Sequence, residues 1–259
     1  MINSKDFLKK YFEFQKGTAF DGLKELGFGF LVSSKTDDSF YWNNCFVEKE
    51  ITELNIQKIE KIMSLIKRNP CFYLLNDDYK NIKLLEKENY EKEATDQWMF
   101  FSDNFDIRDF SNYKKVKNLD DLDIFLETFN QCYQKNDSQN PYGELGGYID
   151  TAKKAWVTKS KNDQLEYFIF YNENNKPVAV SSLTNFKGIG YISNVGSLQE
   201  VRGLGFGKKA TLFCINQSIL NHNKTHCLAT EKGHYPYEFY KRLGFKDKFS
   251  ASFYLKHIK

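Results

Sequence analysis

The sequence predicts an α/β protein with two related halves, and three observations carry the prediction. A glycine-rich stretch at 202–207 lies between an apolar segment at 191–198 and a segment with helical periodicity, which gives the order strand, loop, helix. A further strand and a short helix that ends before Gly244 follow, and then a last strand. Much of this pattern recurs 155 residues earlier, which indicates a tandem repeat.

The other elements of the C-terminal half follow from periodicity and turn residues. Apolar positions at helical spacing predict helices over 119–133 and 149–158, and the polar stretch 136–148, which contains several glycines, predicts the loop between them. Residues 165–171 and 178–183 predict the two strands of a hairpin, because a run of Asn and Glu separates them. These elements would supply a sheet with helices beside it.

The N-terminal half matches the C-terminal half at three points without gaps. The aligned pairs are 227–230 with 72–75, 239–245 with 84–90, and 253–254 with 98–99. Asn89 then replaces Gly244, and Asn is the other residue that adopts a left-handed helix cap. The same shift places 202–207 on 47–52, which contains two acids and no glycine. We therefore expect the N-terminal copy to be degenerate and to repel a phosphate group.

Composition limits the class of protein. The chain has 259 residues, of which 41% are hydrophobic and 17% aromatic, enough for a sizeable core in one or two domains. It contains no apolar run of 18 residues, so we expect no membrane span. Its five cysteines are scattered and odd in number, without a C-x-x-C pair. This usage is typical of buried thiols in a reduced, cytoplasmic protein.

Charge and histidine spacing argue against two further classes. Residues 1–110 hold 16 basic and 20 acidic side chains, whereas 111–259 hold 21 and 14. A net +7 in the second half suits a small polyanionic ligand but is too mild to indicate nucleic acid. His222 and His226 stand four apart without a third ligand nearby in the sequence, so we expect a solvated turn there and no metal.

The glycine-rich stretch has the properties of a phosphate-binding loop. Glycine allows backbone N–H groups to approach a ligand closely, and a helix N-terminus presents unpaired N–H donors with a partial positive charge. The spacing excludes both common nucleotide motifs. A dinucleotide fingerprint would need a third glycine at Lys208, and a P-loop would need Ser or Thr at Lys209. The alternative is a glycine-rich surface turn with solvated lysines.

A second motif favours the phosphate-binding interpretation. Residues 235–245 read Y-P-Y-E-F-Y-K-R-L-G-F, with Pro236 suited to a first helical turn and Gly244 to a left-handed cap. Together with R-x-x-G-x-G at 202–207, this segment resembles the GNAT (GCN5-related) family of N-acetyltransferases. The resemblance covers roughly residues 113–255. It implies two tandem acyl-CoA N-acyltransferase-like domains, each with a mixed, mostly antiparallel sheet flanked by helices.

The resemblance also implies domains, a co-substrate and site residues. A degenerate acetyltransferase-like domain would span 1–110, and a domain binding acetyl-CoA would span 111–259. Tyr240 would donate a proton to the leaving thiolate, and Glu231 is a candidate base, with His234 as a second. Gly233 departs from the Asn that many members carry seven residues before the tyrosine. The residues expected to bind acetyl-CoA are Val195, Gly196, Ser197, Leu198, Arg202, Gly203, Leu204, Gly205, Phe206, Gly207, Lys208 and Tyr240.

Several alternatives stay open at this level. Gly196 could mark a bulge that admits the pantetheine arm, or it could be a packing glycine. The acceptor, a small-molecule or peptide amine, would lie against 131–148, where Tyr142, Glu144 and Tyr148 could attract a cation. A CoA-binding sensor or scaffold without catalysis, a different acyl donor, and a homodimer are also compatible with the sequence. We expect neither a nucleic-acid nor a membrane partner.

Overall fold

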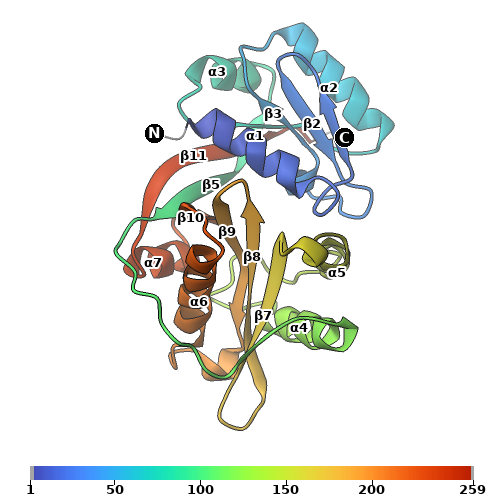
Figure 1. The fold of residues 1–259 in the computed structure, drawn as a ribbon. Helices are drawn as coiled ribbons and strands as arrows, with labels where there is room; N and C mark the ends of the chain where they lie inside the picture. Colours follow the sequence, from blue (N-terminus) through green and yellow to red (C-terminus); the bar gives the residue numbers. More distant parts are fainter. Residues whose placement is uncertain (1–2, 258–259) are drawn as a thin grey trace. The chain divides into compact units, whose positions relative to one another are not determined.

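The computed structural model describes residues 3–257 and divides the chain into two compact units, shown in Figure 1. The first unit contains Met1–Gln97 and Phe249–Lys259, and the second contains Trp98–Lys248. The chain crosses between units within strands β5 and β11, which have the bounds Glu91–Phe101 and Phe245–Leu255.

The first unit contains a sheet with the strand order β1-β2-β3-β4-β11. Its pairs are antiparallel except for β3 with β4, which are parallel. Helix α2 connects these two parallel strands, as a crossover connection requires. The elements before β5 are α1 (Ser4–Gln15), β1 (Gly22–Glu25), β2 (Gly29–Ser33), a 3₁₀ turn at Phe40–Trp42, β3 (Asn44–Val47), α2 (Glu53–Leu65), β4 (Cys71–Leu75) and α3 (Tyr79–Lys87).

Alternation along the strands of the first unit sends side chains to both faces of its sheet. Phe72 and Leu74 of β4 belong to a buried cluster that includes Ile56 and Ile59 of α2 and Leu85 of α3. On the other face the Tyr73 ring lies 5.9 Å from the Phe12 ring of α1, centroid to centroid. Both faces are therefore covered by helices, which explains why β4 is apolar throughout.

The second unit repeats the same arrangement, with four described α-helices where the first unit has three. Its sheet has the strand order β10-β9-β8-β7-β6, and β9 with β10 is again the parallel pair. The elements are β6 (Tyr113–Lys115), α4 (Leu119–Cys132), α5 (Tyr148–Lys159), 3₁₀ turns at Ser160–Asn162 and Gln199–Val201, β7 (Leu165–Tyr171), β8 (Pro177–Phe186), β9 (Ile189–Ser197), α6 (Phe206–Leu220), β10 (Thr225–Glu231) and α7 (Tyr235–Arg242).

Period-two alternation on β7 also separates two cores in the second unit. Tyr167 and Ile169 lie in the cluster formed with α4 and α5. Phe168 and Phe170 lie in the cluster formed with α6 and α7. Figure 1 shows the two helix pairs on opposite faces of the sheet. Because this sheet is sandwiched, β7 is buried on both sides and reads as a continuous apolar strand.

The structure confirms the tandem repeat. The first copy of the repeat runs β1, β2, β3, α2, β4, α3 and β5, and the second runs β7, β8, β9, α6, β10, α7 and β11. In each copy three antiparallel strands are followed by a helix, a strand parallel to the third, a second helix and a long last strand. Subtracting 155 from the bounds of β11 gives 90–100, one residue from the observed β5, and the same shift places α7 within one residue of α3. Asn89 and Gly244 both adopt the left-handed conformation, with φ of 63° and 99°.

The boundary between the compact units differs from the boundary at residue 110 that we expect from the sequence. The first part of the first unit ends at Gln97, and of the described residues at the other end of the chain, 249–257 join it. The physical reason is strand pairing, because residues 251–255 of β11 pair antiparallel with residues 75–71 of β4. Such long-range pairing leaves no local trace in the sequence.

Candidate active site

The glycine-rich loop takes the conformation that its composition predicts. Gly203 and Gly205 have φ of 83° and 87°, a region that side chains rarely adopt, and the loop leads directly into α6 at Phe206. Gly205 occupies the N-cap position and has no side chain to accept from the first N–H groups of the helix. The first turn of α6 therefore presents backbone donors and the positive end of the helix dipole.

The corresponding helix start in the first unit is closed. Thr52 caps α2 through a capping box with Asn55, whose side chain accepts from the Thr52 N–H at 2.9 Å. The N–H of Ile51 donates to Asn81 Oδ1 at 2.9 Å, and the Ile51 side chain is buried. Lys5 of α1 donates to the Glu48 carbonyl at 2.8 Å. Side chains of the protein accept from the N–H groups of Ile51, Thr52 and Asn55, which the second unit's glycine loop leaves to a ligand, so this copy is degenerate in structure as well as in sequence.

The sheet of the second unit opens beside the glycine loop. The parallel pairing of β9 with β10 covers Ile189–Tyr191 and Thr225–Cys227, and both strands continue beyond it. On its other side β9 carries a bulge, since Val180 lies opposite Gly196 but Ser182 lies opposite Ser193. Asn194, inside the bulge, has φ of 52°. A bulge bends the strand and increases its twist, which accounts for the divergence from β10.

Gly196 is a packing glycine beside the bulge. A Cβ atom placed there would lie 2.7 Å from Cys132 Cβ and 3.2 Å from a ring carbon of Tyr133. The end of α4 therefore lies directly against β9, and only glycine permits this approach. The sequence allowed Gly196 to mark a bulge or to be a packing glycine. Gly196 packs against α4, and the bulge is present beside it, at Asn194 and Val195.

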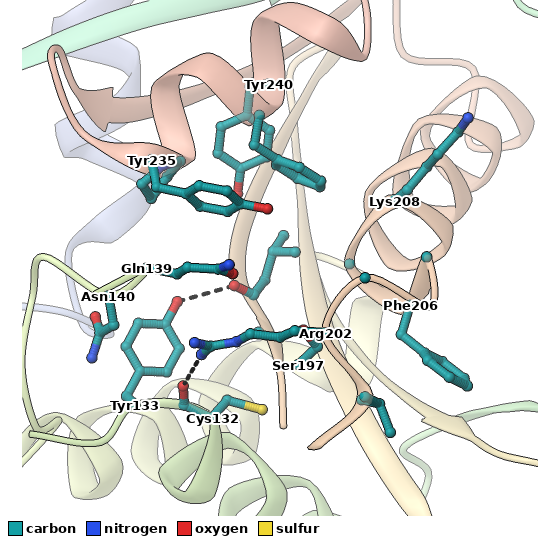
Figure 2. Close-up of a pocket in the computed structure, with 18 of the residues that line it drawn as sticks. Cys132, Tyr133, Gln139, Asn140, Ser197, Arg202, Phe206, Lys208, Tyr235 and Tyr240 are labelled. Carbon is teal, nitrogen blue, oxygen red and sulfur yellow. Dashed lines mark hydrogen bonds between the residues drawn. The ribbon is translucent and has the colours of Figure 1, made fainter. Parts of the chain in front are cut away.

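These elements surround a cavity of about 220 Å³, drawn in Figure 2. Phe206 and Lys208 lie on the α6 side, whereas Gln139, Asn140 and Tyr235 lie on the opposite side. The lining residues are Cys132, Tyr133, Gln139, Asn140, Tyr142, Val195, Gly196, Ser197, Val201, Arg202, Gly203, Gly205, Phe206, Gly207, Lys208, Tyr235, Pro236, Phe239 and Tyr240.

Tyr240 is placed by α7, which Pro236 begins and Gly244 terminates. Its ring contacts Phe239 and Phe245, with centroid distances of 5.2 and 5.7 Å. Within residues 3–257 its hydroxyl has no hydrogen-bond partner, and the hydroxyl points into the cavity in Figure 2. Burial raises the pKa of Tyr240, and the nearby Tyr142 raises it further. The phenol therefore stays protonated at neutral pH.

Two other phenols line the same cavity and are fixed by hydrogen bonds. The Tyr133 hydroxyl donates to the carbonyl oxygen of Val195 at 3.1 Å, which ties α4 to the bulge of β9. The hydroxyl oxygen of Tyr142 lies 3.1 Å from Thr230 Oγ1 on β10. Burial raises the pKa of Tyr133, and a charge on Tyr240 or Tyr142 would raise it further.

Arg202 lines the cavity, but its guanidinium is already engaged. Nη1 forms an ion pair with the buried Oδ1 of Asp137, and Nη2 donates to the Cys132 carbonyl at 3.5 Å. The Asp137 side chain is only 2% exposed, and the Arg202 guanidinium holds the pKa of that carboxyl below its usual value. The pair fastens the loop after α4 to the start of the glycine loop.

The structure brings together ten of the predicted site residues. They are Val195, Gly196, Ser197, Arg202, Gly203, Gly205, Phe206, Gly207, Lys208 and Tyr240. Three others lie elsewhere. Leu198 is buried in the core beneath α4, Leu204 is 71% exposed, and Glu231 is outside the cavity lining, where its carboxylate lies 3.4 Å from His234 Nε2.

Sequence reasoning missed several lining residues. Gln139 and Asn140 fall in the loop that was expected to face the acceptor, and Tyr235 and Phe239 fall in the late-helix motif, so the motifs could have indicated them. Tyr133 falls in the same expected range, 131–148, but nothing in the sequence marks its hydrogen bond to Val195, which is 62 residues away. Glu144, expected near the acceptor, is exposed and outside the lining.

The expectation of a solvated turn at His226 is wrong. His226 lies in β10, and its Nδ1 is 2.7 Å from the hydroxyl oxygen of the buried Ser218. Burial lowers the pKa of His226. Over residues 3–257, no group of three His, Cys, Asp or Glu side chains lies close enough to hold a metal ion.

Two further observations concern the chain as a whole. All five cysteines are buried and none forms a disulfide, as the scattered spacing predicts. Within the described range, no helix is both long enough and apolar enough to cross a membrane.

Comparison with known proteins identifies the fold. No family model and no curated protein matches the sequence. Among solved structures, a GCN5-related N-acetyltransferase from Kribbella flavida matches with a TM-score of 0.68 at 13% identity, over 100% of this chain and 97% of that one. One from Sphaerobacter thermophilus matches with a TM-score of 0.64 at 13% identity, over 98% and 85%.

A tandem GNAT protein from the clavulanic acid biosynthesis pathway also matches. Its TM-score is 0.58 at 9% identity, over 90% of this chain and 80% of that one. These likenesses extend over both units. The chain therefore has the fold of tandem GCN5-related N-acetyltransferases, with an open cavity in its second unit and a closed counterpart in its first.

Proposed function

We propose that this protein is an N-acyltransferase that moves an acetyl group from acetyl-CoA to a primary amine by direct attack. One observation carries the proposal. The open first turn of α6 and the partnerless hydroxyl of Tyr240 face one cavity, where the β9–β10 pairing ends. That cavity combines a phosphate site with a proton donor.

The phosphate end of the cavity suits the pyrophosphate of CoA. Gly203, Gly205 and Gly207 line it without side chains, so backbone N–H groups can approach the ligand directly. Lys208, which also lines it, adds a positive charge. We expected Arg202 to bind the phosphate, but its guanidinium forms an ion pair with Asp137, so we assign it the role of stabilising the loop.

The diverging strands suit the pantetheine arm. Beyond Tyr191 the edge of β9 is no longer paired with β10, and Gly196 and Ser197 on this edge line the cavity. An extended arm with two amides can hydrogen-bond to a strand edge as a further strand would. The thioester would then lie toward Tyr240.

Tyr240 suits the departure of the thiolate. The amine nitrogen attacks the thioester carbonyl, a C–N bond forms, and the C–S bond breaks. The Tyr240 hydroxyl gives its proton to the departing sulfur and regains one from solvent. The raised pKa of Tyr240 keeps its hydroxyl protonated until the thiolate departs, as a general acid requires. A CoA sensor without catalysis would have no use for this hydroxyl.

The buried, unpaired cysteines support a reducing compartment, and we place the protein in the cytoplasm on that ground.

A thermal-shift titration with a matched pair of variants tests the proposed ligand. A ligand that binds only the folded state raises the melting temperature with concentration. We expect acetyl-CoA and CoA to stabilise the wild type, and NAD and ATP to have little effect. Gly205→Glu should abolish the shift, because it adds a negative charge and a side chain at φ of 87°.

Lys224→Glu is the control for that titration. Lys224 is exposed and lies outside the cavity lining, so this substitution adds a negative charge away from the glycine loop. This variant should fold and keep the shift. No stabilisation of the wild type by CoA, or an unchanged shift in Gly205→Glu, would refute the phosphate-loop assignment.

A further inference from the structure

The charges around the cavity are distributed unevenly. Of its lining residues, only Arg202 and Lys208 carry a charge, and both are cationic. None of the described lining residues is Asp, Glu or His. The carboxylate of Asp137 is not among the lining residues and forms an ion pair with Arg202. The side of the cavity away from Lys208 presents phenols and carboxamides, namely Tyr133, Gln139, Asn140 and Tyr235, and Tyr142 also lines the cavity.

The cavity therefore lacks a side chain that could take a proton from an amine at neutral pH. Burial raises the pKa of Cys132 to about 12, and burial also raises those of Tyr133 and Tyr240, so these groups stay protonated. Glu231 and His234, the two bases that the sequence suggests, lie 3.4 Å from each other and are outside the lining. The acceptor must bring its own unprotonated nitrogen.

An uncharged wall also disfavours the protonated amine itself. An ammonium group that enters a partly buried site without a carboxylate loses hydration and gains no ion pair. The positive charge of Lys208 opposes it further, whereas that of Arg202 is paired with Asp137. A polyamine would place several such charges in the same surroundings.

Ordinary amine basicity then decides between acceptors. At pH 7.5 about one third of α-amino groups are neutral, taking a pKa near 7.8. For a lysine ε-amine, with a pKa near 10.4, only about one in 800 is neutral. The difference in reactive nitrogen is about 250-fold at equal concentration.

We infer that the acceptor is a weakly basic primary amine on an uncharged body, such as the α-amino group of a peptide or of an amino-acid amide, and not a lysine side chain or a polyamine. The inference rests on the proposed function. The amine enters as the free base, attacks the thioester, and gives its surplus proton to water. The phenols and carboxamides hold the neutral body through hydrogen bonds and ring contacts.

The test compares acceptors of similar shape whose nitrogens differ in basicity. Phenylalaninamide and 2-phenylethylamine share an aromatic ring, and the neighbouring carbonyl makes the first amine the weaker base. Release of CoA thiol is measured from pH 6 to 10.5 with saturating acetyl-CoA, with spermidine and Nα-acetyl-lysine amide as further acceptors.

We expect log(kcat/KM) to rise with unit slope and to level at the pKa of each acceptor's own amine. The ratio between the two aromatic amines should exceed tenfold at pH 7.5 and fall toward one above both pKa values. Profiles that bend at one common pH for both acceptors would show that an enzyme group takes the proton, and would overturn the inference.

Faster transfer to spermidine or to the lysine derivative at pH 7.5 would overturn it as well. Disappearance of the rising limb in Glu231→Gln would do the same, because it would identify Glu231 as the base. Failure of the proposed function looks different, since no amine would then be acetylated at any pH.

Discussion

Replacement of Tyr240 by Phe separates proton donation from packing at this site. The ring contacts with Phe239 and Phe245 remain in the variant, and the lost hydroxyl has no hydrogen-bond partner within residues 3–257. The free energy of unfolding should therefore change by less than about 0.5 kcal/mol. The affinity for acetyl-CoA should change little for the same reason.

The effect on turnover should be large. A positioned general acid contributes roughly 10²–10⁴-fold, which corresponds to about 3–5 kcal/mol of transition-state stabilisation. We expect kcat to fall by that factor in Tyr240→Phe, with KM for acetyl-CoA within about threefold of the wild type. The assay is steady-state thiol release at pH 7.5 with saturating acceptor.

Tyr142→Phe is the matched control, because it removes a phenol from the same cavity. Its hydroxyl contacts Thr230 Oγ1, so this variant loses a hydrogen bond worth about 1 kcal/mol of stability but not the proton donor. Its kcat should fall less than tenfold. Wild-type turnover in Tyr240→Phe, or equal losses in the two variants, would refute the proton-donor role.

Two further predictions concern the surroundings of the site. Gly196→Ala should destabilise by about 1–3 kcal/mol in urea unfolding, because the new Cβ would lie 2.7 Å from Cys132 Cβ, and adding Cys132→Gly should recover part of that loss; an additive double variant would contradict this contact. Burial lowers the pKa of His226 below its usual 6.5, so the unfolded chain binds the proton more readily than the folded chain does. The contribution of His226 to stability should therefore be complete above pH 6.5 and be lost as the pH falls below 6.5. The drop in urea midpoint between pH 7.5 and 5.5 should be smaller in His226→Gln, and an equal drop would contradict the assignment.

The parts of the fold that local sequence encodes were predicted well. Gly205 and Gly244 have the positive φ that their positions require, and Pro236 stands in the first turn of α7. The repeat was visible because helix caps and apolar strands recur at one fixed shift. Each helix cap and each apolar strand is recognised from residues within a few positions of one another.

The contacts that complete the site could not be predicted, because they join distant segments. Asp137 and Arg202 are 65 residues apart, and nothing near Asp137 marks it as a buried carboxylate. The exclusion of Glu231 from the cavity lining likewise depends on where β10 ends relative to α7. The pairing of β11 with β4 has the same origin and moved the end of the chain into the first unit.

Isothermal titration calorimetry with acetyl-CoA tests the central claim most directly, because it gives both affinity and stoichiometry. The open first turn of α6 and the closed first turn of α2 predict one site per chain, and Gly205→Glu should remove it. Absence of binding, two sites per chain, or a single site that survives Gly205→Glu would contradict the account.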